Sequence, residues 1–211
     1  MAVTVTATQP RGPEHHEMRG RILAAAEARF RRNGYGRTTV ADIAGDVRVS
    51  TAYIYKFFPS KLAICEGVCG EILTRIDAEL WRVARAETPA PRRLERLYQT
   101  LLSESVALLF NDRQLHDMVT EAIEYRWSSV ERHRDAMRNA AEAIIADGRA
   151  EGAFETETPL QEAAAAIFSS LIAFAHPKVL EHSLAAGEDL AAHARYTARL
   201  VIAGLRPREQ S

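Results

Sequence analysis

The chain has 211 residues, enough for one large domain or two small ones. Apolar residues make up 47% of it and charged residues 26%, and the formal net charge is −1, an ordinary composition for a globular protein. The longest apolar stretch, Ala163 to Ala175, is too short to span a bilayer, and two cysteines cannot form a disulfide scaffold. The composition therefore excludes membrane-spanning and disulfide-rich secreted classes and predicts a cytoplasmic protein with no membrane partner.

The charges are divided unevenly along the chain. Residues 1–61 hold ten Lys and Arg against five Asp and Glu, whereas residues 62–211 hold 17 against 23. A basic N-terminal part on an acidic body favours contact with a polyanion through the N-terminal part alone. A solvated basic surface would give the same charge balance, so the sequence motifs have to distinguish it from a surface that contacts a polyanion.

Three short helices are predicted in the N-terminal part. Apolar residues at helical spacing from Met18 to Phe30 indicate the first, which ends at Asn33–Gly36 because glycine accepts the left-handed conformation that closes a helix. Thr39, followed three residues later by an acid, predicts a capping box that starts a second helix, to about Asp46. Ser50 can cap a third, Thr51 to Phe58, which stops at Pro59.

Longer helices are predicted in the rest of the chain, divided by prolines and glycines. Neither an alternating strand pattern nor an internal repeat is visible, so the fold class is all-α with about nine helices. Pro177 predicts a kink or a break in the fifth of six C-terminal segments, Leu160–Ala185. The expected ranges are about Ser60–Ala86, Arg92–Phe110, Arg113–Tyr125, Trp127–Arg149, Leu160–Ala185 and Glu188–Leu205.

The second and third helices are separated by a four-residue turn, which is the spacing of a helix-turn-helix. Residues 18–66 resemble the DNA-binding domain of the TetR family of bacterial transcriptional regulators. The matching residues are Ile22-Leu23, Ala26, Phe30, Gly34-Tyr35, Thr38-Thr39, Ile43-Ala44, Val49-Ser50, Tyr55, Phe58 and Ser60-Lys61. The resemblance implies a DNA-binding domain at 18–61, a ligand-binding and dimerisation domain at 62–211, and a flexible tail at 1–17. In that tail, Arg11 either reaches a minor groove or has no role.

Position in the motif assigns a role to each candidate DNA-binding residue. Thr39 opens the second helix, where its hydroxyl and nearby amides can hold a phosphate. Outward-facing side chains of the third helix would specify sequence, provided that Ile54 and Phe57 or Phe58 face inward. The residues expected to position the protein on the backbone are Thr39, Arg48, Tyr55 and Lys61, and those expected to read bases are Thr51, Ala52, Tyr53 and Lys56.

Two of these positions depart from the family pattern. Arg48 occupies a turn position where the family has a small residue, at a cost on the order of 1 kcal/mol if the turn is left-handed. Ala52 replaces the family's usual glycine and carries a methyl that could meet a thymine methyl. The operator sequence therefore cannot be taken over from relatives.

The C-terminal domain is expected to carry an effector pocket and a homodimer interface. Small residues at helical spacing in the last helix, Ala191, Ala194, Ala198 and Val201, are expected to permit close helix contact. The candidate ligand-binding residues are large apolar or aromatic side chains on the middle and late helices, for each of which a place in the core is the alternative: Val106, Phe110, Met118, Ile123, Trp127, Met137, Phe168 and Phe174.

No cofactor and no metal site are expected. Cys65 and Cys69 are four residues apart on one helix face and are interpreted as buried, inert thiols, with a redox or metal role as the alternative. Asp112 and His116 fall one helical turn apart, which leaves a metal site as a weaker reading.

The function expected from this resemblance is that of a dimeric repressor that binds a near-palindromic double-stranded DNA operator. In this family the operator often lies upstream of the regulator's own gene or of the gene for an efflux pump. A small aromatic or amphipathic effector would release the DNA. The alternative is a DNA-bound interaction or architectural protein of the same fold without an effector. An enzyme is not expected, because the sequence has neither a nucleophile elbow nor a phosphate loop.

Overall fold

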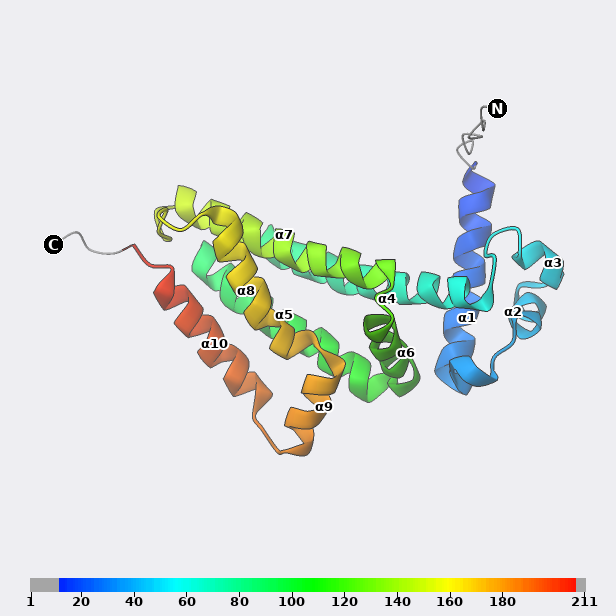
Figure 1. Cartoon of the computed structure of the whole chain (residues 1–211). Coiled ribbons are helices and arrows are strands. Elements are labelled where there is room, and N and C mark those ends of the chain that lie inside the picture. The colour runs from blue at the N-terminus through cyan, green and yellow to red at the C-terminus, as the bar shows by residue number, and fades with distance from the viewer. Residues whose placement is uncertain (1–11, 208–211) are drawn as a thin grey trace, which may run out of the picture. The chain divides into compact units, whose positions relative to one another are not determined.

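The computed structural model describes residues 12–207, which form ten α-helices and no β-strand (Figure 1). The predicted all-α class is confirmed, and the expected nine helices become ten because the segment from Leu160 to Ala185 breaks in two. The predicted role of Arg11 lies outside the described residues. The helices are α1 (Pro13–Arg37), α2 (Val40–Val47), α3 (Thr51–Ile54), α4 (Lys61–Ala84), α5 (Ala90–Asn111), α6 (Arg113–Glu124), α7 (Ser128–Ala150), α8 (Leu160–Ala175), α9 (Pro177–Ala185) and α10 (Leu190–Gly204).

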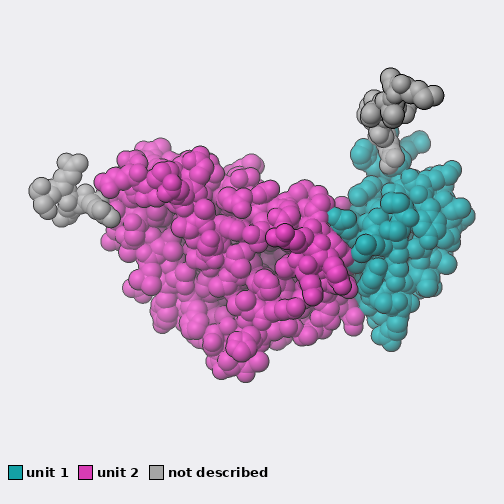
Figure 2. Space-filling model, in the orientation of Figure 1, with its two compact units in different colours: residues 1–68 teal, residues 69–211 magenta. Residues whose placement is uncertain are grey.

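The chain divides into two compact units, of which the first ends at Val68 and the second begins at Cys69 (Figure 2). The division falls inside α4, whereas the sequence places the domain boundary between residues 61 and 62, where that helix begins.

The first unit is built on α1, whose apolar stripe forms the core together with α2 and the segment after it. Ile22, Phe30, Ile43 and Ile54 are each at most 1% exposed. The stretch from 13 to 17, expected to be part of the flexible tail, is helical, because Pro13 in the first turn has a φ angle preset for a helix. Near its other end α1 is interrupted at Gly34, where φ is 76° and ψ is 158°.

The third helix is much shorter than predicted. Only Thr51–Ile54 are α-helical, and residues 55–57 continue in hydrogen-bonded turns. The amide of Lys56 donates to the carbonyl of Tyr53 at 3.1 Å, and the amide of Phe57 donates to that of Ile54 at 2.9 Å. Aromatic residues at 55, 57 and 58 ahead of Pro59 favour this tight ending over a regular helix.

In the second unit α5 is central, since it packs against α6, α7, α8, α9 and α10. The small residues Ala194 and Ala198 of α10 are fully buried within this chain. The expectation that they form a contact between two copies is therefore wrong for these two positions. The predicted break at Pro177 is confirmed, with α8 and α9 bent by 56° across it.

A buried arginine joins three helices of the second unit. Arg93, 4% exposed at the start of α5, donates to the Ala84 carbonyl at 2.8 Å and pairs with Asp147 at 2.6 Å and Glu151 at 2.9 Å. Sequence reasoning missed this cluster, which fixes the ends of α4, α5 and α7 relative to one another.

Among residues 12–207, no single helix is both long enough and apolar enough to cross a membrane. Only the bent pair α8 and α9, taken together, meets that length and composition.

Candidate functional site

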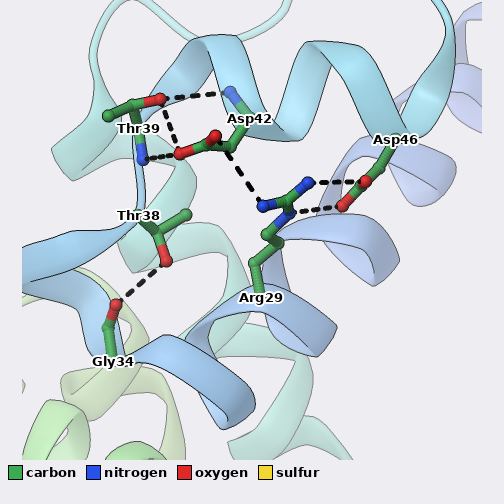
Figure 3. A network of polar contacts seen from close by, with 6 residues as sticks. All are labelled: Arg29, Gly34, Thr38, Thr39, Asp42 and Asp46. Carbon is green, nitrogen blue, oxygen red and sulfur yellow. Dashed lines mark hydrogen bonds and ion pairs between the residues drawn. The ribbon is translucent and has the colours of Figure 1, made fainter.

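A polar network fixes α2 against α1 in the first unit (Figure 3). Arg29 of α1 holds Asp46 with two hydrogen bonds, 2.6 and 2.8 Å long, in the bidentate geometry that makes such pairs specific. Its third nitrogen lies 3.7 Å from Asp42. One turn away, the Thr38 hydroxyl donates to the Gly34 carbonyl at 2.9 Å, so the glycine break and the start of α2 are held together.

The predicted capping box is present at the start of α2. The Asp42 amide donates to the Thr39 hydroxyl oxygen at 3.1 Å, and the Asp42 carboxylate accepts from the Thr39 amide at 2.8 Å and from its hydroxyl at 2.7 Å. These hydrogen bonds, chiefly the one from the hydroxyl, hold the pKa of Asp42 below its usual value. The hydroxyl proton of Thr39 is thus already donated to a carboxylate, so this hydroxyl can donate to a phosphate only by leaving Asp42.

Hydrogen bonding also perturbs the arginine pair. The bonds from Arg29 lower the pKa of Asp46, and the same bonds raise the pKa of Arg29. Both groups therefore stay charged through the neutral range, and the orientation of α2 is held by an ion pair as well as by apolar packing.

The turn between α2 and α3 is left-handed at Arg48, which is the case in which the sequence predicts a cost for a residue other than glycine. Arg48 adopts a left-handed conformation, with φ 60° and ψ 49°, and closes α2. The Val49 amide donates to the Ala44 carbonyl at 3.0 Å, and the Ser50 hydroxyl caps α3 by accepting from the Tyr53 amide at 3.1 Å. The conformation costs about 1 kcal/mol for a residue other than glycine.

The predicted base-reading residues lie in the segment after this turn and reach the surface to different extents. Ile54 and Phe58 are buried, at 0% and 2% exposure, while Ala52 and Lys56 are exposed and Thr51 and Tyr53 are half-buried. Tyr55, predicted to contact a phosphate, is 48% exposed. Phe57 is half-buried rather than core, because its ring lies between those of Tyr53 at 5.3 Å and His15 at 4.4 Å.

Other cations lie around this segment. Lys61, predicted to contact the DNA backbone, opens α4, and its ammonium lies 3.4 Å from the Gly36 carbonyl oxygen and 4.2 Å from the Tyr35 ring. Lys56 lies 5.5 Å from the ring of Tyr53. Arg19, which the motif search did not single out, lies over the ring of Phe58 at 4.9 Å. Its position, three residues before Ile22, the first matching residue, was the only available signal.

The second unit contains a largely apolar cavity of about 70 Å³. It is lined by side chains from six helices and from the residue between α8 and α9: Leu73, Ile76, Ser105, Leu108, His116, Val119, Ile123, Val130, His133, Arg134, Met137, Ile172, Ala175, His176, Pro177 and Leu180. A volume of this size holds a few water molecules, so a larger occupant has to widen it.

Of the eight predicted ligand-binding residues, the structure brings two, Ile123 and Met137, to this cavity. Met118, Trp127 and Phe168 are buried elsewhere in the unit, and Phe110 is 68% exposed. Val106 and Phe174 border two shallow grooves on the surface beside α10. Phe168 is covered by the guanidinium groups of Arg134 and Arg138, at 5.0 and 4.9 Å from its ring.

Sequence reasoning missed the histidines of the cavity. His133 of α7 lies 2.5 Å from the Asp77 carboxylate of α4 through its Nδ1 atom. His116 of α6 is 1% exposed, and burial lowers its pKa, so its ring is neutral at pH 7. Cys65 and Cys69 are fully buried as well. Within residues 12–207, His, Cys, Asp and Glu side chains do not gather in groups of three that could hold a metal ion.

Comparisons with known proteins agree with this arrangement. The family model described as bacterial regulatory proteins, tetR family, matches residues 22–68, and the model of the tetracyclin repressor-like C-terminal domain matches residues 90–194. The nucleoid occlusion factor SlmA of Aliivibrio fischeri is 30% identical over 165 residues, which are 67% of this chain and 84% of that protein. The chain belongs to the TetR family.

Solved structures of TetR-family regulators share the fold. A regulator from Pectobacterium atrosepticum, 18% identical, superposes with a TM-score of 0.72 over 95% of this chain and 100% of its own. FadR of Bacillus subtilis, in complex with stearoyl-CoA, is 20% identical, with a TM-score of 0.61 over 89% of this chain and 99% of its own. This TetR-family member is a DNA-binding transcriptional regulator, and its family and structural neighbours are regulators rather than enzymes.

Proposed function

We propose that this protein is a homodimeric repressor that binds a near-palindromic operator and is released from it by a small, largely apolar effector. The observation that carries the proposal is that the two units hold different candidate binding sites. One presents the segment Thr51–Lys56 on a helix-turn-helix, and the other encloses a mostly apolar cavity. An effector that fits the cavity better in one conformation of the dimer than in another shifts the population between them.

The DNA contacts follow from the exposure of the side chains. Ala52, Lys56, Thr51 and Tyr53 read base edges in the major groove, whereas Tyr55, Arg48 and Lys61 contact phosphates. Two such segments in a twofold dimer reach successive turns of the groove, roughly 34–36 Å apart, which requires an operator with matching symmetry.

The exposed side of α8 and α10 is the surface that supports a dimer. Tyr196 and Leu200 of α10 are 56% and 75% exposed, and α8 exposes the small residues Ala165, Ser169 and Ala173. Large apolar side chains beside small ones permit close helix packing, and an exposed apolar patch of this kind is typical of an interface.

Fluorescence anisotropy with the full chain and DNA from the region flanking its own gene tests the proposal. We expect salt-sensitive, sequence-selective binding by a dimer. Tyr55→Phe should weaken binding to every DNA equally, whereas Tyr53→Ala should reduce the preference for the operator over unrelated DNA. Arg92→Ala, a change at an exposed arginine of the second unit, is the control. Selective binding that no apolar compound reverses would contradict the effector part of the proposal.

The 30% identity to a nucleoid occlusion factor supports an alternative function, that of a DNA-bound interaction protein. In that case the protein binds many chromosomal sites, needs no effector, and recruits another protein. Binding at many sites across the chromosome, unaffected by any apolar compound, would support this function over the repressor.

A further inference from the structure

The first turns of α1 lie before the part of the chain that the family model matches. The match begins at Ile22, whereas α1 begins at Pro13. A proline in the first turn and the acidic Glu14 beside it both favour the start of a helix, so the sequence itself specifies this early beginning. The role of residues 13–21 therefore has to be sought in the contacts that they make in this chain.

One side of these turns packs on the recognition segment, residues 51–58. His15 and Arg19 are half-buried and lie one helical turn apart, so their side chains share a face of α1. The guanidinium of Arg19 lies over the Phe58 ring at 4.9 Å, and the centre of the His15 ring lies 4.4 Å from that of Phe57, with the two planes inclined by 33°. Two successive phenylalanines thus pack on two successive turns of α1.

The contact at His15 continues to a predicted base-reading side chain. The Phe57 ring also meets the ring of Tyr53, at 5.3 Å between centres and with the planes inclined by 64°. His15, Phe57 and Tyr53 therefore form a continuous aromatic row. Phe57 and Tyr53 are only half-buried, so the core does not enclose either ring completely. Ring pairs at such distances and angles attract each other beyond the effect of the area that they bury, so each ring in the row restricts the next.

Tyr53 needs this support because the helix that carries it is short. Only Thr51–Ile54 are α-helical, and turns follow, so few backbone hydrogen bonds fix the direction of the side chains. The ammonium of Lys56 lies 5.5 Å from the Tyr53 ring, but it is on an exposed and flexible side chain. A side chain that is ordered before it binds loses less freedom on binding, and it discriminates best when neighbouring groups fix its rotamer.

From this arrangement we propose that His15 is a positioning residue for DNA recognition. Through Phe57 it holds Tyr53 in the orientation that reads a base, and it does not itself contact the DNA. This role rests on the proposed function, in which Tyr53 reads base edges. It affects the choice between DNA sequences rather than the overall affinity, because phosphate contacts supply most of the affinity that is independent of sequence.

The test uses the full-length protein, a DNA duplex that it selects from a random library, and a scrambled duplex of the same composition. Fluorescence anisotropy gives the ratio of the two affinities. We expect His15→Ala to lower this ratio about fivefold, and to leave the affinity for the scrambled duplex and the slope of log affinity against log salt unchanged. His15→Phe, which keeps a ring against Phe57, should preserve the ratio. His16→Ala, a change at the exposed neighbouring histidine, is the matched control and should alter neither affinity.

A double-mutant cycle shows whether His15 acts through Tyr53. Tyr53→Ala alone should lower the ratio, and adding His15→Ala to it should lower the ratio no further. Fluorine NMR of the protein labelled with fluorotyrosine, without DNA, gives a second readout. The resonance of Tyr53, identified by its absence in Tyr53→Phe, should shift in His15→Ala but not in His16→Ala. The resonance of Tyr98 in the second unit should stay in place, which separates a local change from a general loss of structure.

Two kinds of failure are distinct. An unchanged ratio in His15→Ala, additive losses in the cycle or an unmoved Tyr53 resonance would overturn the positioning role alone. So would equal losses of affinity for both duplexes in His15→Ala and His15→Phe with a smaller salt slope, because His15 would then contact a phosphate directly. A library without a preferred duplex, or an unchanged ratio in Tyr53→Ala, would instead contradict the proposed function and with it the role of His15.

Discussion

The polar contacts between helices reach further along the chain in the second unit than in the first. In the first unit Thr39 with Asp42 and Ser50 with Tyr53 cap helices over three residues, and Arg29 pairs with Asp46 over 17. In the second unit the polar contacts join distant helices, such as His133 with Asp77 and Arg93 with Asp147, 56 and 54 residues apart. Local contacts set the shape of a short motif, whereas distant ones set how whole helices pack. The same type of mutation should therefore have different consequences in the two units.

The largest effect is expected for Arg93→Ala in the second unit. The change leaves the buried Ala84 carbonyl without its donor and removes the partner of Asp147 and Glu151. We expect the free energy of unfolding to fall by about 3 kcal/mol in urea denaturation, less than for a fully buried pair because both carboxylates reach solvent.

Arg92→Ala is the matched control, because Arg92 is adjacent in sequence and exposed, and its loss should cost less than about 0.5 kcal/mol. Equal losses for the two variants would mean that the long-range cluster contributes nothing particular to this unit.

In the first unit the corresponding change is Gly34→Ala. A φ of 76° with a ψ of 158° lies in a region that only glycine populates readily, so we expect a loss of about 2 kcal/mol. Gly36→Ala, two residues later in a helical conformation with open space around its Cα, should be neutral or slightly stabilising. Thermal unfolding of the two variants makes the comparison, and a similar melting temperature for both would refute the role given to Gly34.

The sequence was informative where the structure depends on neighbours in the chain. Thr39, Ser50 and the glycines after Asn33 act on residues three or four positions away, so their pattern identified the helix-turn-helix. The early end of α3 was missed because Pro59, the stop signal in the sequence, lies five residues beyond Ile54, where the helix ends.

The cavity could be predicted only in part, because its wall is assembled from six helices. Ile123 and Met137 were found by their size, but size does not tell which side of a buried helix a residue occupies. Phe110 is exposed at the end of α5, and Trp127 is buried at the start of α7, away from the cavity. The sequence indicated His116 only as a metal ligand beside Asp112 and assigned no role to His133, since the contact of His133 with Asp77 forms only once the helices pack.

Arg48→Gly separates stability from the proposed DNA contact in the first unit. Glycine adopts a φ of 60° without strain, so the free energy of unfolding should rise by about 1 kcal/mol. If Arg48 contacts a phosphate, affinity for DNA should fall, and the slope of log affinity against log salt should decrease by about one. Anisotropy at several salt concentrations measures the slope, and an unchanged slope would mean that the arginine does not reach the DNA.

The smallest effect concerns pH and comes from the second unit. The folded-state pKa of His116 is lowered, chiefly by burial, below its ordinary value of 6.5. The unfolded chain therefore binds this proton more readily, and His116 lowers the free energy of unfolding as the pH falls below about 6.5. Because the neighbouring Arg113 and Glu181 reach solvent, we expect a loss below about 1 kcal/mol between pH 7.5 and 5.5. His116→Gln should remove that part of the pH dependence in urea denaturation, whereas the exposed change His182→Gln should not. The capped carboxylates of the first unit have lowered pKa values instead, so they stay ionised throughout this range and leave the comparison undisturbed.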